Sequence, residues 1–155
     1  MGNLIEDING LSREAALEAV GYLGKSLGIS AEEHAKEREL LEPLTGQPYA
    51  NLADIEQLAR ITLIAAASDP SREASVRKAI EGAGKKQFIL GGAEIVALSV
   101  VALYALQVVM ARGKVSEEQE IEIVEEKGKK TIKIRKSGKF GISGKLAGVL
   151  GAVLK

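Results

Sequence analysis

The pattern of apolar positions divides the chain into a helical first half and a more varied second half. Residues 1–85 contain four stretches that read as helices, three from the helical spacing of their apolar side chains and one, highly charged, from its capping pattern. The first follows Ser12, whose hydroxyl can accept a hydrogen bond from the first turn of a helix. The second begins with a capping-box pattern at Ser30, the third begins at Asn51, and the fourth covers residues 70–81. Four short helices of this kind predict a small helical bundle.

The longest apolar stretch covers residues 88–110, FILGGAEIVALSVVALYALQVVM. Its 23 residues contain one charged side chain, Glu94, and one amide side chain, Gln107. A helix of this length, rising about 1.5 Å per residue, is long enough to cross about 30 Å of hydrocarbon. The sequence leaves two interpretations open. The stretch is either a single membrane span or a central helix surrounded by the rest of the protein or by other copies of it.

Beyond this stretch the pattern changes to an alternation with a period of two residues, which is typical of β-strands. Isoleucines alternate with glutamates in residues 120–124 and with lysine and arginine in residues 132–135. Because the sequence Lys-Gly-Lys at 127–129 lies between the two runs, they predict a two-stranded antiparallel hairpin with one apolar and one charged face. We expect the glutamates of the first strand to lie opposite Lys133 and Arg135.

The last segment, from Ile142 to Lys155, returns to helical spacing. Its apolar residues form one stripe, and its opposite side consists of glycine, alanine and Lys145. Each glycine costs a helix about 1 kcal/mol relative to alanine, so this amphipathic helix needs a partner surface in order to form. The partner surface is the core of the same chain, another subunit or an anionic bilayer.

These patterns together predict a mainly α protein with one β-hairpin. Residues 1–85 are expected to form an N-terminal helical bundle. Residues 86–114 are expected to form a long apolar helix, either transmembrane or central and buried. Residues 115–155 are expected to form the basic hairpin and the C-terminal amphipathic helix. A chain of 155 residues is long enough for one domain with a hydrophobic core.

Charge is distributed unevenly, although the net charge is zero. Residues 1–85 contain 14 acidic and 9 basic side chains, whereas residues 86–155 contain 7 acidic and 12 basic ones. Residues 127–155 contain nine lysines and arginines and no acidic residue. A segment with charge of one sign attracts anionic surfaces, and here it can equally pair with the acidic first half of the chain.

Composition and motifs argue against catalysis and cofactor binding. The chain has no cysteine, which excludes disulfide scaffolds and thiolate metal sites, and its one histidine, His34, lies among glutamates and is expected in a surface ion pair. Three glycines spaced three apart, the last of them Gly144, precede Lys145, but a phosphate loop needs Ser or Thr where this chain has Leu146. We expect a flexible glycine connection there. The sequence therefore predicts a protein that is not an enzyme and binds no metal or cofactor.

One block of the chain resembles a known group of proteins. From Gly91 to Lys139, a glycine-led apolar helix (GGAEIVALSVVALYALQVVMARG) and a basic exit precede two strands around a glycine turn (EIEIVEEKGKKTIKIRK). This order of parts resembles the helix-plus-hairpin core of the small effector-associated modules of bacterial conflict (antiphage) systems. The N-terminal region differs, because it is helical where a strand is expected. The resemblance implies a non-enzymatic adaptor that couples sensing to an effector.

The sequence thus predicts a protein–protein assembly module, a homo-oligomer or a complex with another protein, in the cytoplasm or associated with the inner membrane. We expect no secretion, because the N-terminus lacks a basic region followed by an apolar run. The apolar surfaces of residues 88–110 and 142–155 would be buried between chains, and the acidic and basic halves would set the orientation. The residues expected to make these contacts are Ile95, Leu98, Val101, Leu106, Leu146, Val149, Leu150 and Val153.

Two alternative functions are left open. A membrane-disrupting effector would insert the same apolar segments while its basic run binds anionic lipid. A basic accessory protein would contact the phosphates of a nucleic acid, and the aromatic content of 3% argues against recognition of bases by stacking. No small-molecule substrate is indicated. An anionic surface would be bound by Lys127, Lys129, Lys130, Lys133, Arg135, Lys136 and Lys139.

Overall fold

The computed structural model describes residues 4–29, 35–41, 52–67, 72–83, 92–112, 121–126, 129–134 and 138–153. The described part is mainly helical, which confirms the predicted fold class at this level. Its elements, in chain order, are α1 (Leu4–Asn9), α2 (Arg13–Ser26), α3 (Ala35–Leu40), α5 (Leu52–Ala67), α6 (Glu73–Gly82), α7 (Gly92–Arg112), β1 (Ile121–Glu126), β2 (Lys129–Ile134), β3 (Gly138–Ile142) and α8 (Gly144–Val153).

Local sequence signals define both ends of α2. Ser12 is its N-cap, as predicted, and the Ser12 hydroxyl accepts a hydrogen bond of 3.1 Å from the backbone N–H of Ala15. After the helix, Gly28 has a φ of 72°, the left-handed conformation that suits glycine. The N–H of Ile29 donates to the carbonyl of Gly24 at 2.9 Å, and the N–H of Gly28 donates to that of Lys25 at 3.1 Å. These two bonds form a Schellman motif, which satisfies the last carbonyls of the helix.

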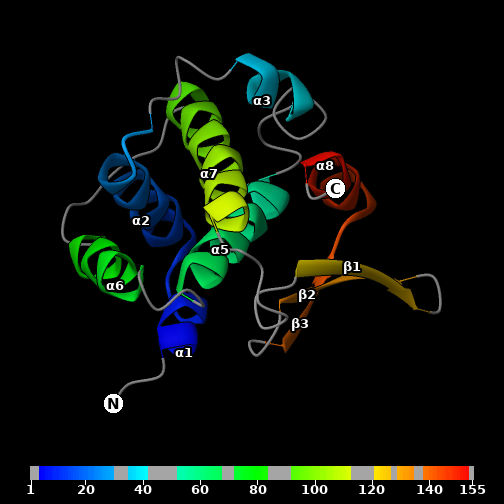
Figure 1. The fold of residues 1–155 in the computed structure, drawn as a ribbon, viewed down its shortest axis with the longest axis horizontal. Helices are drawn as coiled ribbons and strands as arrows, with labels where there is room; N and C mark the ends of the chain where they lie inside the picture. Colours follow the sequence, from blue (N-terminus) through cyan, green and yellow to red (C-terminus); the bar gives the residue numbers. More distant parts are fainter. Residues whose placement is uncertain are drawn as a thin grey trace.

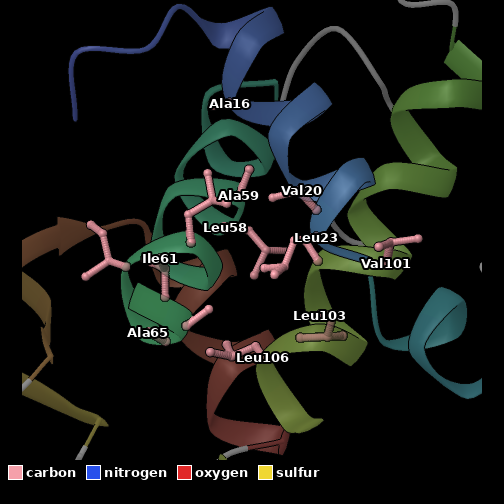
Figure 2. Close-up of a cluster of buried hydrophobic side chains, with 14 of the residues drawn as sticks. Ala16, Val20, Leu23, Leu58, Ala59, Ile61, Ala65, Val101, Leu103 and Leu106 are labelled. Carbon is pink, nitrogen blue, oxygen red and sulfur yellow. The ribbon is translucent and has the colours of Figure 1, made fainter. Parts of the chain in front are cut away.

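Helix α7 lies at the centre of the molecule, between α2 and α5, with α6 beyond α2 and α8 on the opposite side (Figure 1). Its middle turns are buried, with Leu103 and Leu106 fully enclosed. Figure 2 shows that these side chains point into the same cluster as Leu23 of α2 and Leu58 of α5. The arrangement is that of a central helix packed inside one chain.

No helix in the part of the chain that the structure describes is both long enough and apolar enough to span a lipid bilayer.

Glycines allow α2 to approach α7 closely. A Cβ atom added to Gly24 would overlap Cγ1 of Val101, and one added to Gly21 would lie 3.0 Å from Cδ2 of Leu98. The two glycines are three residues apart and therefore lie on the same side of α2. On this side of α2, the branched side chains of Leu98 and Val101 pack directly against the helix backbone.

The strands form one antiparallel sheet in the order β1-β2-β3. In its register, Ile121 lies opposite Ile134 and Ile123 lies opposite Ile132, while Phe140 of β3 lies opposite Ile132 on the other side of β2. Apolar positions are thus paired with apolar positions in the middle of the sheet, whereas Ile142 of β3 lies opposite Lys130. Because residues two apart share a face, the isoleucines of β1 and β2 and Phe140 lie on one face of the sheet.

The third strand corrects one prediction. Gly138 and Gly141 were expected in a flexible connection, but they lie in β3, where they are paired with Ile134 and Thr131. Glycine has a low strand propensity, so residues 138–142 carry no local signal for a strand. The ladder to β2 supplies the missing stabilisation. Helix α8 accordingly begins at Gly144, two residues later than expected.

The other differences are one additional helix and one shifted helix start. Helix α1 was not predicted, and α6 begins at Glu73 rather than at residue 70. The capping-box pattern at Ser30 and the expected helix start at Asn51 lie outside the described residues. A single hydrophobic core runs through the described helices, from Leu4 in α1 to Leu150 in α8.

Candidate assembly surfaces

Most of the apolar residues predicted to contact a partner lie inside the chain. Five of them are buried in its hydrophobic core: Val101, Leu106, Leu146, Val149 and Leu150. Leu98 is partly buried and packs against the same core. Ile95 and Val153 belong to α7 and α8, but their side chains lie outside the described part of the structure. In this conformation the five buried residues have no surface to offer to a second chain or to a bilayer.

The basic run is only partly described. Lys129, Lys130 and Lys133 lie in β2 and Lys139 lies in β3, whereas Lys127, Arg135 and Lys136 lie outside the described residues. The register sets each lysine of β2 opposite a glutamate of β1: Glu122 with Lys133, Glu125 with Lys130 and Glu126 with Lys129. A carboxylate directly across the ladder lowers the positive potential of each of these lysines. The glutamates of β1 thus offset part of the charge of the β2 lysines, whereas Lys133 also lies opposite Lys139 of β3.

One end of the sheet is fixed to the helices. The Gln57 side-chain amide of α5 donates a hydrogen bond of 2.5 Å to the carbonyl oxygen of Gly141 in β3. Next along the chain, Ile142 packs against the hydrophobic core. The Ser143 hydroxyl then accepts a 3.1 Å hydrogen bond from the backbone N–H of Leu146 and so caps α8, whose buried residues belong to that core. These contacts hold β3 on the helical body.

The opposite side of the sheet ends at β1, and no further strand in the described part of the chain pairs with it. Strand β1 comes first in the strand order, and among the described elements its one extensive neighbour is β2. Figure 1 shows that β1 and β2 extend to the side of the molecule, beyond the helices. The outer edge of such a strand carries backbone N–H and C=O groups that are available for pairing. We call the outer side of residues 121–126 the β1 edge.

A polar cluster in the described part of the chain joins α1, α2 and α5. The carboxylate of Glu56 accepts hydrogen bonds from Nε of Arg13 at 2.7 Å and from Nε and Nη2 of Arg60 at 3.3 and 3.2 Å. The Arg60 guanidinium also donates to the carbonyl oxygens of Ile8 at 2.7 Å and Leu11 at 2.6 Å. Arg60 thereby satisfies carbonyls at the end of α1 and in the turn after it. Sequence reasoning missed this cluster, because its members are far apart along the chain.

The electrostatics of Glu56 follow from this geometry. Partial burial on its own would raise the pKa of the Glu56 carboxyl. The hydrogen bonds and positive charges of Arg13 and Arg60 act in the opposite direction and prevail, so the pKa of Glu56 lies below its ordinary value of 4.5. The cluster ties helices together, and we assign it a structural role.

Among the described residues there is no group of three or more side chains arranged to hold a metal ion. His34 lies outside them. Comparison of the chain with known protein families, with curated proteins and with solved structures finds no match.

Proposed function

We propose that this chain is a non-enzymatic protein–protein assembly module of the adaptor type, and that its contact element is the sheet rather than its apolar helices. The observation that carries the proposal is the open β1 edge, on the side of the sheet away from the contacts that fix β3. Exposed strand edges pair readily with an extended segment of another chain, unless short length, charge or a cover prevents it. Strand addition to such an edge is a recurring mode of protein recognition.

The burial of the apolar helix residues supports this choice of surface. An assembly that buried α7 and α8 between chains would have to unpack the core of each chain, because both helices belong to it. Unpacking even a few large apolar side chains costs several kcal/mol, as each contributes about 1.5–3 kcal/mol when buried. Pairing at the β1 edge would leave α7 and α8 packed in the core. A role in a bacterial defence system rests on the resemblance of residues 91–139 and is proposed on that ground alone.

A selection from random displayed peptides tests the proposal. The bait is the full chain, and the peptides have about ten residues, enough for one strand. We expect peptides to be enriched on the unaltered chain and lost on Val124→Lys, because a lysine in an edge strand opposes strand addition. The control variant is Ala74→Lys, which adds the same charge at an exposed position of α6 and should keep the enriched peptides.

Two results would contradict the proposed function. One is a selection that enriches nothing on the unaltered chain. The other is enrichment that survives in Val124→Lys as fully as in Ala74→Lys, which would place the contact elsewhere. Far-ultraviolet circular dichroism of both variants checks that the helices and the sheet are retained.

A further inference from the structure

We propose that the β1 edge accepts an extended segment of another protein that carries lysine or arginine opposite the glutamates of β1 and branched apolar residues opposite its isoleucines. This inference rests on the proposed function and specifies the chemistry of the partner. Strand β1 already has this complementarity with its neighbour in the sheet, β2.

Strand β2 shows what kind of strand β1 pairs with. Each of the three glutamates of β1 lies opposite a lysine of β2, and each of its two isoleucines lies opposite an isoleucine. The remaining position, Val124, lies opposite Thr131. The pairing is therefore complementary at every charged and every isoleucine position of the ladder. Opposite-charge and apolar cross-strand pairs of this kind stabilise a sheet, and like charges in the same places destabilise it.

The outer edge of β1 presents the same sequence as the inner edge. A residue in a strand lies directly opposite one residue in each of the two neighbouring strands, so a strand added outside would meet the same glutamates and isoleucines. An added strand with the pattern of β2 would thus repeat the internal pairing. A strand with acidic residues in place of the three lysines of β2 would bring carboxylates opposite Glu122, Glu125 and Glu126.

A second copy of this chain is a poorer occupant of the β1 edge. Two β1 strands side by side would combine their glutamates without any lysine between them. Strand β3 offers one lysine and two glycines in five residues, and its Gly141 carbonyl already accepts the Gln57 amide. The charge pattern therefore favours a basic and apolar segment from a different protein.

Direct binding of defined peptides to the full chain tests the inference. The first probe is a fluorescent peptide Lys-Lys-Thr-Ile-Lys-Ile, which copies residues 129–134. The second replaces its lysines with glutamates, and the third keeps the lysines but has N-methylated backbone amides. We expect the first probe to bind at least about tenfold more tightly than either of the others. The N-methylated probe has the same charge and cannot form a ladder, so it separates strand addition from simple charge attraction.

Variants of the chain provide the second comparison. Glu122→Gln combined with Glu125→Gln should weaken binding of the first probe about tenfold. Glu6→Gln combined with Glu14→Gln removes the same charge from exposed positions of α1 and α2 and should leave binding unchanged. If the sheet of the first pair of variants fails to form, the three probes on the unaltered chain still decide the question.

Several outcomes would overturn the inference. Equal binding of the lysine and glutamate probes would show that β1 does not select a basic strand. Equal binding of the lysine probe and its N-methylated form would show that the peptide binds without strand pairing. An oligomer of the chain that the lysine probe dissociates would show that a second copy occupies the edge. Displayed peptides that need the β1 edge but carry no excess of lysine and arginine would also overturn the inference, while leaving the proposed function intact.

Discussion

At the scale of single residues, the packing of α2 on α7 depends on the absence of a side chain at Gly24. Gly24 is buried, and an added Cβ atom would overlap Cγ1 of Val101. We expect Gly24→Ala to lower the free energy of unfolding by about 1–3 kcal/mol, because overpacking forces neighbouring side chains or the backbone to shift. The measurement is chemical denaturation followed by circular dichroism.

A matched glycine on α8 provides the control. Gly148 is exposed, and a Cβ atom built on it has nothing within 4 Å. Gly148→Ala should therefore raise the free energy of unfolding by up to about 1 kcal/mol, the difference in helix propensity. A Gly24→Ala variant as stable as Gly148→Ala would contradict the close approach of α2 and α7.

For Gln107, too, the structure predicts the direction in which a substitution changes the stability of the fold. Its side-chain nitrogen is buried and has no hydrogen-bond partner in the described structure. An unpaired buried donor costs about 1–3 kcal/mol, so Gln107→Met, which keeps the length and removes the donor, should leave stability unchanged or raise it. The Tm from thermal denaturation measures this effect.

Thr62 is the appropriate comparison for Gln107. Its buried hydroxyl lies 2.9 Å from the carbonyl oxygen of Leu58 and 3.0 Å from that of Ala102, so it joins α5 to α7. Thr62→Val removes this hydrogen bond while keeping the shape, and should lower stability by about 1 kcal/mol. If Gln107→Met proves the more destabilising of the two, the Gln107 amide has a partner after all.

At the scale of elements, the Glu56 cluster predicts a pH dependence of stability. The pKa of Glu56 is lowered in the folded state by Arg13 and Arg60, so the unfolded chain binds a proton at this site more readily. The ionised carboxylate therefore stabilises the fold at pH values above its unfolded-state pKa. That contribution is lost as the pH falls through the lower, folded-state pKa. Denaturation of the wild type and of Glu56→Gln at a series of pH values should show a smaller loss in the acid range for the variant, and equal losses would contradict the assignment.

The same cluster shows why some elements could be predicted and others could not. Ser12 and the apolar spacing after it predict the start of α2 from local signals alone. Helix α1 has six residues, too few to be stable alone, and it depends on the hydrogen bonds of Arg60 from another helix. Strand β3 likewise depends on its ladder with β2. Elements that need a distant partner leave little trace in their own sequence.

The β1 edge could be predicted only in part, because its sequence pattern is local whereas its place at the edge of the sheet depends on the other strands. The alternation of glutamate and isoleucine in residues 120–124 is visible in the sequence, and it determines what kind of strand can pair there. The strand order that leaves β1 at the edge is a property of the folded sheet. The apolar periodicity of α7 and α8 showed that these helices must be covered. It did not show that the same chain covers them, and so it led to Val101 and Leu150 as contact residues.

At the scale of the whole molecule, the three segments predicted from the sequence (1–85, 86–114 and 115–155) contribute to one shared hydrophobic core. Leu146, Val149 and Leu150 of α8 belong to the same hydrophobic cluster as the residues of α2, α5 and α7. Each large apolar side chain removed from this cluster takes away about 1.5–3 kcal/mol. Three such losses are comparable with the total stability of about 5–15 kcal/mol that a domain normally has.

A truncated chain tests this view of the core. Residues 1–114 retain α1 to α7 but lack the sheet and α8, and we expect this fragment to lose cooperative unfolding, since the side of the core that α8 covers becomes exposed to water. Leu150→Ala in the full chain should lower stability by about 2–5 kcal/mol for the same reason. Thermal denaturation and hydrogen exchange measure both effects. A fragment that melts in one sharp transition at the Tm of the full chain would instead show that the helical body is an independent domain, and that α8 and the sheet are attached to it without sharing its core.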